Sequence, residues 1–190
     1  MNRIDVRPVR TGELEAVAVL RWQWAQERQR TPVTSRDEFV RRFVTWALEH
    51  ESSHRCLVVA REGTCGAEAG GDTDREDIRE MACDEGTLLG MAWLAITRRV
   101  PHPGAPERAS GDVQCVYVVP DERDGGLGAR LMDGVLALAR DLGLERVTVH
   151  SSDRAVTAYT RAGFAHSPLL LQAEVAREGQ PGTRTAPVRP

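Results

Sequence analysis

A glycine-containing turn follows a run of β-branched residues and is the segment of this chain best suited to bind an anion. Residues 113–129 read VQCVYVVPDERDGGLGA: the first seven favour a strand, Pro120 ends it, and Gly126 and Gly128 precede an amphipathic helical pattern. Glycine lets the backbone approach an anion with no Cβ in the way, and free N–H groups at a helix start carry partial positive charge. The segment therefore predicts a site for a ligand that carries phosphates.

Two familiar phosphate-binding motifs do not match this turn. A P-loop requires GxxxxGK followed by Ser or Thr, but the chain contains no lysine, and all 25 of its Lys or Arg residues are arginine. A dinucleotide fingerprint requires a third glycine three residues after Gly128, where the chain has Leu131. The P-loop is therefore excluded, and only half of a dinucleotide fingerprint is present.

The spacing of an arginine and two glycines in the turn has a closer match. The pattern Arg123-x-x-Gly126-x-Gly128 resembles the acetyl-CoA signature of the GNAT N-acetyltransferase superfamily, which is Arg or Gln-x-x-Gly-x-Gly or Ala. The strand, its terminating proline, the arginine and the glycines also occur in the order that this superfamily shows.

A second segment resembles the same superfamily. Residues 151–164 are similar to its late block, Asn-x-x-Ala-x-x-x-Tyr-x-x-x-Gly-Phe, and four positions match at the right intervals: Ala155, Tyr159, Gly163 and Phe164. The usual Asn is Ser152, a shorter side chain that still donates and accepts hydrogen bonds. Because two ordered motifs agree, the chain is identified as a member of the GNAT superfamily over roughly residues 4–175.

The fold class implied by this resemblance is α/β, of the mixed α+β kind. It has a central, mixed but mostly antiparallel sheet of six to seven strands, flanked by about four helices. Hydrophobic periodicity predicts a compatible order. The expected strands cover residues 4–10, 56–60, 87–97, 113–119, 144–150 and 169–175, and the expected helices cover residues 11–25, 35–47, 127–142 and 153–162.

The resemblance also implies which residues hold acetyl-CoA, the expected cosubstrate. Backbone N–H groups of the turn would bind the pyrophosphate, and Arg123 and Arg130 would add charge-assisted hydrogen bonds, although Arg130 also fits a solvated helix position. The turn residues concerned are Gly125, Gly126, Leu127, Gly128 and Ala129. The pantetheine arm would pair like an extra strand with the backbone of Tyr117, Val118 and Val119, near Ser152.

The general base is the least determined part of the predicted site. An alkylammonium group has a pKa of about 10.4 and must lose a proton before it attacks the thioester. Many relatives use a Glu on the fourth strand, but this chain has Gln114 at the usual position. Asp112 is expected on the same strand face, and we predict it to be the base. Two alternatives remain: Asp112 in a turn before the strand, or a water held by backbone carbonyls.

Tyr159 is the predicted general acid. A phenol with a pKa of about 10 can protonate a thiolate whose parent thiol has a pKa of about 8.5, and the resemblance gives Tyr159 this role. The alternative is a core tyrosine that packs on Phe164. His150 is expected to be structural rather than a proton relay. Cys115 lacks a neighbouring base, which favours direct transfer over a cysteine intermediate.

Composition predicts one domain and excludes several kinds of partner. With 190 residues and 41% apolar content, the chain supports one core, in a domain expected over residues 1–177. We expect an acidic loop insertion at residues 62–85 and a disordered tail at residues 178–190. A net charge of -3, no basic arm and no long apolar stretch argue against nucleic acid and membrane partners and predict a cytoplasmic protein.

The remaining expectations concern ligands and function. The four cysteines lack metal-site spacing, so no metal is expected, and a homodimer is compatible with the sequence. The predicted activity is acetyl transfer from acetyl-CoA to a primary amine, a small molecule rather than a protein amine. The alternative is a noncatalytic acyl-CoA-binding sensor, suggested by Gln114. Substrate choice should depend on the helix pair and on the loops at residues 28–36 and 98–111; the four tryptophans could line an aromatic pocket or pack in the core.

Overall fold

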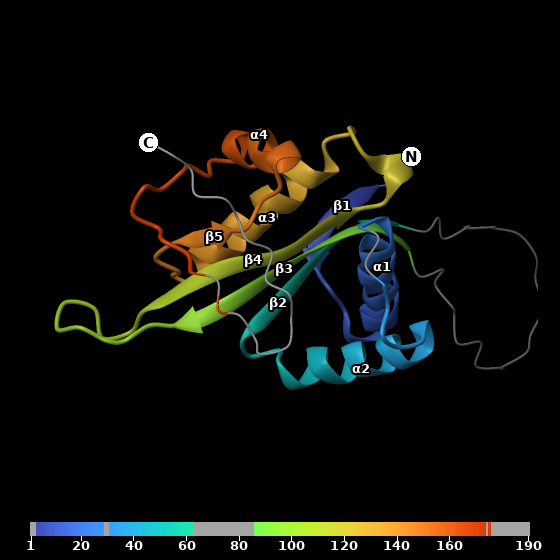
Figure 1. Ribbon diagram of the computed structural model, residues 1–190, viewed down its shortest axis with the longest axis horizontal. Coiled ribbons are helices and arrows are strands. Elements are labelled where there is room, and N and C mark those ends of the chain that lie inside the picture. The colour runs from blue at the N-terminus through green and yellow to red at the C-terminus, as the bar shows by residue number, and fades with distance from the viewer. Residues whose placement is uncertain (1–2, 29–30, 63–85, 174, 176–190) are drawn as a thin grey trace, which may run out of the picture.

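The computed structural model describes residues 3–28, 31–62, 86–173 and 175. The predicted tail at residues 178–190 lies outside the described residues, as does the predicted acidic insertion except for its first residue, Glu62. The chain forms a mixed five-stranded sheet with the order β1-β2-β3-β4-β5 (Figure 1). Neighbouring strands are antiparallel except β4 and β5, which are parallel. The strands are β1 Ile4–Pro8, β2 His54–Arg61, β3 Thr87–Arg98, β4 Ala109–Val118 and β5 Val147–Val149.

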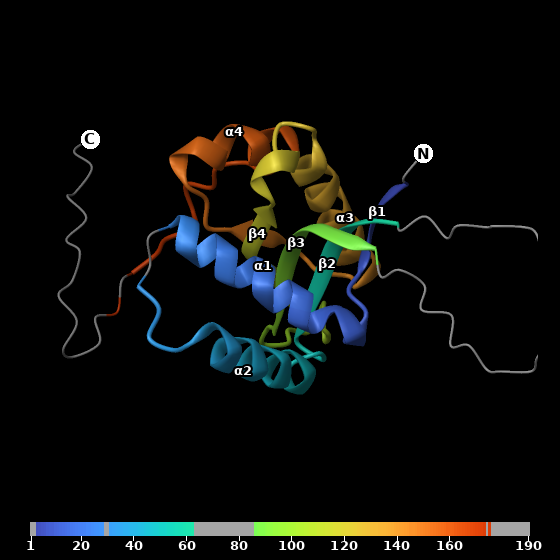
Figure 2. The same ribbon diagram turned by 90° about the vertical axis from the view of Figure 1, so that its right-hand side faces the viewer.

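Four helices cover the two faces of this sheet. Helices α1 Leu14–Glu27 and α2 Arg36–Glu49 lie on one face, and α3 Leu127–Asp141 and α4 Asp153–Arg161 lie on the other (Figures 1 and 2). Each pair has its own apolar core because strand residues alternate between faces. Val58 and Met91 pack toward α1, whereas Val59 and Leu94 pack toward α3. The predicted α/β class and helix number are therefore confirmed.

The helix boundaries follow local capping chemistry. Ser35 caps α2 by accepting a hydrogen bond from the Glu38 N–H group at 3.2 Å, as its position ahead of the apolar pattern suggests. Helix α3 stops at Gly143, which adopts a left-handed φ of 65° that favours glycine. These caps fix where α2 begins and where α3 ends.

The predicted strand number was too high. Residues 169–173 form no strand, and Leu169 and Leu171 are about nine-tenths exposed. The strand expected at residues 144–150 is reduced to the three residues of β5. A β-branched or apolar run becomes a strand only where a neighbouring strand supplies its hydrogen bonds. The strand at the edge of the sheet, β5, has only three residues with which a further strand could pair. Within the part of the chain that the structure describes, the sheet therefore has five strands rather than six or seven.

Strand β4 begins earlier than predicted and contains an irregularity. It starts at Ala109, so Asp112 lies inside the strand, and the alternative that placed it in a preceding turn is wrong. Trp93 pairs with Cys115 while the next residue, Leu94, pairs with Val113, which leaves Gln114 as an extra residue. Such a β-bulge bends the strand and changes which face the following side chains occupy.

Candidate active site

The candidate site begins where β4 and β5 separate. The two strands pair only from Gly111 to Val113, opposite Val147 to Val149, and the rest of β4 has no β5 partner. The bulge at Gln114 coincides with this separation. A parallel pair that splits in this way opens a passage between the two faces of the sheet.

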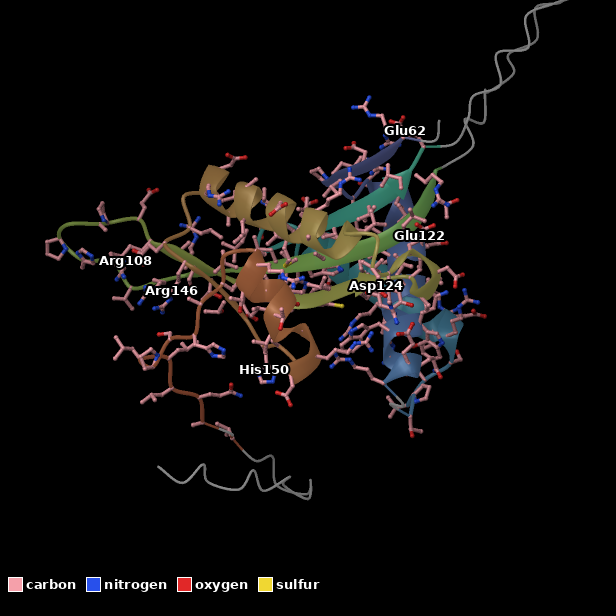
Figure 3. The ribbon with its side chains drawn as sticks, turned by 90° about the horizontal axis from the view of Figure 1, so that it is seen from above. Glu62, Arg108, Glu122, Asp124, Arg146 and His150 are labelled. Carbon is pink, nitrogen blue, oxygen red and sulfur yellow. The ribbon has the colours of Figure 1, made fainter. Side chains whose placement is uncertain are left out.

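A cavity of about 230 Å³ occupies the split. Its walls come from β4, from the first turn of α3, from the segment between β5 and α4, from α4 and from the end of α1. The lining residues include Trp24, Arg28, Gln114, Cys115, Gly128, Ala129, His150, Ser152 and Tyr159. His150 lies between β5 and α4, and Asp124 lies in the turn before α3 (Figure 3). The cavity therefore joins the predicted cosubstrate turn to the late block of the sequence.

The turn before α3 has the geometry of an anion site. Gly126 precedes the helix with a left-handed φ of 79°, and Asp124 also has a positive φ of 65°. No side chain caps α3, so the N–H groups of its first turn receive no side-chain acceptor. A Cβ atom at Gly128 would meet nothing within 4 Å. Gly128 and Ala129 line the cavity, so this helix start can receive a phosphate group there.

The two arginines assigned to the cosubstrate have partners within the chain. The Arg123 Nε atom donates to the Val118 carbonyl at 2.9 Å, and its Nη2 atom donates to Glu27 at 2.6 Å. Arg130 donates to the Ile4 carbonyl at 2.8 Å. Both side chains therefore brace the turn and α3 against the sheet. Their predicted contacts with the pyrophosphate remain a prediction.

The strand segment assigned to pantetheine also has internal partners. The Val118 carbonyl accepts the bond from Arg123, and the Val119 N–H group donates to the Leu89 carbonyl at 2.9 Å. Burial raises the pKa of Tyr117 to about 12, and its hydroxyl donates to Glu27 at 2.7 Å. The part of β4 that lines the cavity is residues 113–116, just before the predicted segment.

Tyr159 lines the cavity and also packs on Phe164. The two rings meet edge to face with centroids 5.5 Å apart, so the two roles weighed for this tyrosine are compatible. Burial raises the pKa of Tyr159, and the nearby Cys115 adds to this rise, whereas Arg28 opposes it. The phenol is therefore protonated at neutral pH, as a general acid must be.

Cys115 lines the same cavity as Tyr159 but is a poor nucleophile. Its side chain is buried, and burial raises the pKa of its thiol despite a contact with the Arg21 guanidinium at 3.7 Å. A protonated, buried thiol does not attack a thioester efficiently. This placement is compatible with direct transfer.

Asp112 is not among the residues that line the cavity. Its carboxylate accepts a hydrogen bond from the Thr148 hydroxyl at 3.0 Å. The expectation that Asp112 shares a strand face with Gln114 assumed regular alternation, but the bulge at Gln114 interrupts this alternation. Val113 packs against the α3 core, so the preceding residue, Asp112, lies on the α1 face of the strand.

The comparisons with known proteins identify the family. The profile described as "Acetyltransferase (GNAT) family" matches residues 16–164, which is more than half of the chain. The chain belongs to the GNAT acetyltransferase family. Members of this family are acyltransferases, and one similar structure holds their cosubstrate. That protein, described as a predicted acetyltransferase from Clostridium acetobutylicum with acetyl-CoA, superposes with a TM-score of 0.62 at 13% identity; the match covers 90% of this chain and 96% of that protein.

Curated relatives of this GNAT chain act on different acceptors. A mycothiol acetyltransferase from Cellulomonas flavigena is 34% identical over 113 residues, which are 57% of this chain and 32% of the relative. A glucosamine 6-phosphate N-acetyltransferase from Trypanosoma brucei brucei is 32% identical over 79 residues, which are 42% of this chain and 52% of the relative. The chain thus spans about half or less of these relatives, and their names do not agree on a substrate.

The sequence did not lead us to predict a role for two residues of this GNAT site, Arg28 and Glu27. Arg28 was treated only as a loop boundary, yet it lines the cavity, and Glu27 joins Tyr117 to Arg123. The signal was present in α1, where Arg21, Trp24 and Arg28 follow at helical intervals that place them on one side. Trp24 lines the cavity, whereas Trp46 and Trp93 pack in the core on the α1 face.

Metal and membrane features are reported for the described residues only. Within that part of the chain, no three His, Cys, Asp or Glu side chains come together as a metal site would require. None of the helices that the structure describes combines the length and the apolar character needed to span a bilayer.

Proposed function

We propose that the protein transfers an acetyl group from acetyl-CoA directly to a primary amine, and that the acceptor is a small molecule rather than a protein. The observation that carries this proposal is the split between β4 and β5, which exposes an uncapped helix start and a protonated tyrosine in one cavity. Acetyl-CoA supplies the activated acyl group when it is bound. The chain's own residues bind, orient and exchange protons.

On the cosubstrate side, backbone groups do most of the binding. The N–H groups at the start of α3, around Gly126 and Gly128, would hold the pyrophosphate, and the open space beside Gly128 would admit it without a steric clash. Ser152 begins α4 and lines the same cavity, which agrees with its predicted place beside the pantetheine arm. The phosphate end and the late block thus serve one ligand.

On the chemical side, the new N–C bond forms as the C–S bond breaks. The amine loses a proton during attack, and the departing thiolate gains one from Tyr159. Asp112 would have to act through bridging water, because its carboxylate is held by Thr148 and does not line the cavity. The geometry favours the other route, in which a water held by backbone carbonyls of the bulged strand at Gln114 removes the proton.

A noncatalytic acyl-CoA sensor is the second candidate. It is favoured by one observation: within the described residues, the cavity lining contains no Asp or Glu side chain that could act directly as a base. The two functions predict the same cosubstrate binding and differ only in acceptor-dependent turnover.

The test combines binding with release of free CoA thiol. Acetyl-CoA at 100 times its dissociation constant should stabilise the full chain by about 2.7 kcal/mol, and this thermal shift applies to both functions. Thiol release that depends on an added amine, measured across a panel of amines, would support the transferase. Stabilisation without amine-dependent thiol release would support the sensor, and no stabilisation at all would rule out both.

A further inference from the structure

The end of α1 brings a positive charge into the cavity from the face opposite the cosubstrate turn. Trp24 packs with the core on the α1 face, whereas Met132 and Tyr159 pack with the core on the α3 face, yet all three line the same cavity. The cavity therefore passes through the split sheet. The helix start that suits phosphate lies on the α3 face, which leaves the α1 face for the acceptor.

Arg28 is held in place on that face. Its guanidinium carbon lies 4.5 Å from the ring centroid of Trp24, and the Arg21 guanidinium carbon lies 4.0 Å from the same ring. Arg21 in turn reaches Cys115 in the cavity wall. Stacking on an indole restricts a guanidinium without consuming its N–H donors. Arg28 is thus an exposed residue that lines the cavity with its guanidinium packed on Trp24.

Among the described residues, no carboxylate neutralises the positive charge of Arg28. No Asp or Glu of the described residues lines the cavity, and Arg28 forms no ion pair within residues 3–28, 31–62 and 86–173. The adjacent carboxylate, Glu27, is occupied by Tyr117 at 2.7 Å and by Arg123 at 2.6 Å. A second ammonium group on the acceptor would therefore meet repulsion here, and an anionic group would find a partner.

Resting on the proposed function, we propose that the acceptor amine carries an oxyanion, a carboxylate or a phosphate, and that Arg28 binds this group. The forked guanidinium matches the two oxygens of either group and forms charge-assisted hydrogen bonds with them. Because Arg28 and Tyr159 line the same cavity, an anion bound at Arg28 places the amine in the cavity with the phenol. Arg28 is then a specificity-determining residue, and polyamines are poor acceptors.

The test uses acceptor pairs that differ in the anionic group. Phosphoethanolamine is compared with ethanolamine, and β-alanine with β-alaninamide, for the full chain and for Arg28→Gln. The matched control is Arg42→Gln, an exposed arginine of α2 that pairs with Glu38 and does not line the cavity. Of phosphoethanolamine and β-alanine, we consider whichever one the natural chain acetylates. Its kcat/KM should fall by about 10- to 100-fold in Arg28→Gln and change little in Arg42→Gln. The acetyl-CoA KM should not change.

Each other outcome has a definite meaning. An equal loss for both members of a pair, or a preference for putrescine over every anionic amine, would overturn the proposal. A raised acetyl-CoA KM in Arg28→Gln would also overturn it, by placing Arg28 on the cosubstrate's phosphates. The phosphate and carboxylate pairs distinguish which oxyanion is bound.

A binding measurement separates this proposal from the proposed function. If no amine gives turnover, the thermal shift caused by phosphoethanolamine and by β-alanine is measured in the presence of CoA. A shift that is lost in Arg28→Gln but kept in Arg42→Gln would retain the anion site although the transferase had failed. No shift from either anion in any of the three proteins would overturn the site as well.

Discussion

The two faces of the cavity present different chemical groups to a ligand, backbone groups on one face and side chains on the other. On the α3 face, the site consists of backbone: a left-handed Gly126, an open Gly128 and the uncapped N–H groups of a helix start. On the α1 face, it consists of side chains, with Arg28 stacked on Trp24. A ligand common to a whole family can be held by backbone, which constrains residue type only at glycines. A ligand that differs between members must be recognised by side chains.

This difference explains why the cosubstrate site on the α3 face could be predicted from the sequence, whereas the residues on the α1 face could not. The spacing of Arg123, Gly126 and Gly128 identified the cosubstrate turn because glycine is required where the backbone is left-handed or closely approached. Arg28 carries no such signature, since a charged residue at the end of a helix is ordinarily solvated. The predictions below test whether the two faces and the tyrosine between them act separately.

The largest expected effect is at the junction of the two faces. Tyr159→Phe removes the phenol and should lower kcat by about 100-fold or more, because general acid catalysis typically contributes that much. Burial raises the pKa of Tyr159, so the alkaline limb of the wild-type kcat profile should lie above the ordinary range for tyrosine and be absent in the variant. Thr160→Val, which removes a hydroxyl that bonds only to the Val156 carbonyl on the same helix, is the control. Equal kcat values in the two variants would remove Tyr159 from the chemistry.

The next effect concerns the anchor of α1, which positions the acceptor face. Glu13 is buried and accepts bonds from Arg7 at 2.5 and 2.8 Å and from the Arg10 N–H group at 2.8 Å. Glu13→Gln should lower the free energy of unfolding by about 2 kcal/mol, as expected for hydrogen bonds to a charged group. Denaturant unfolding measures this, and Glu38→Gln, which alters ion pairs to the exposed Arg41 and Arg42 on α2, should change stability only slightly.

The pH dependence of stability follows from the same carboxylate. Hydrogen bonds from Arg7 hold the pKa of Glu13 below its usual value, so this stabilisation is complete above the unfolded-state pKa of about 4.3 and is lost as the pH falls through the lower folded-state pKa. The acid-induced loss of stability should therefore be smaller in Glu13→Gln than in the natural chain. Identical acid profiles would show that Glu13 does not anchor α1 in this way.

A smaller effect is expected on the α3 face. Gly126→Ala forces a side chain into a left-handed conformation and should cost about 1 kcal/mol of stability. The altered turn should also raise the acetyl-CoA KM by about fivefold, which corresponds to about 1 kcal/mol of binding. Gly143→Ala has the same conformational cost at the other end of α3, with open space around it, and should leave the KM unchanged. If both variants raised the KM equally, the turn would have no special role.

The smallest effect is expected at Asp112. Asp112 does not line the cavity, and Asn keeps an Oδ1 atom that can accept the hydrogen bond from Thr148, so Asp112→Asn should change kcat/KM by less than about threefold. A fall of about 100-fold with a displaced acid limb in the pH profile would instead make Asp112 the base. This measurement decides between the carboxylate and the water relay.

Individual helices and strands show which structural features could be predicted from the sequence. Helices α2 and α3 lie close to the expected ranges, residues 35–47 and 127–142, because the caps at Ser35 and Gly143 depend on local backbone chemistry. The strand predicted at residues 169–175 was wrong over its described residues 169–173, because a strand needs a partner that local propensity does not supply. The bulge at Gln114 was not predictable either, since it arises from the register between β3 and β4, and it interrupts the regular alternation on which the expected place of Asp112 depended.

The sequence by itself determined the family, the α/β class and the glycine turn that suits the cosubstrate. It did so because motif spacing within one turn or one helix fixes local geometry directly. Only the tertiary structure decided that β4 and β5 separate at Gln114, that Arg28 reaches the cavity, and that Glu27 pairs with Tyr117 and Arg123. These are contacts between segments far apart in the chain, and packing and strand register, rather than local preference, bring them together.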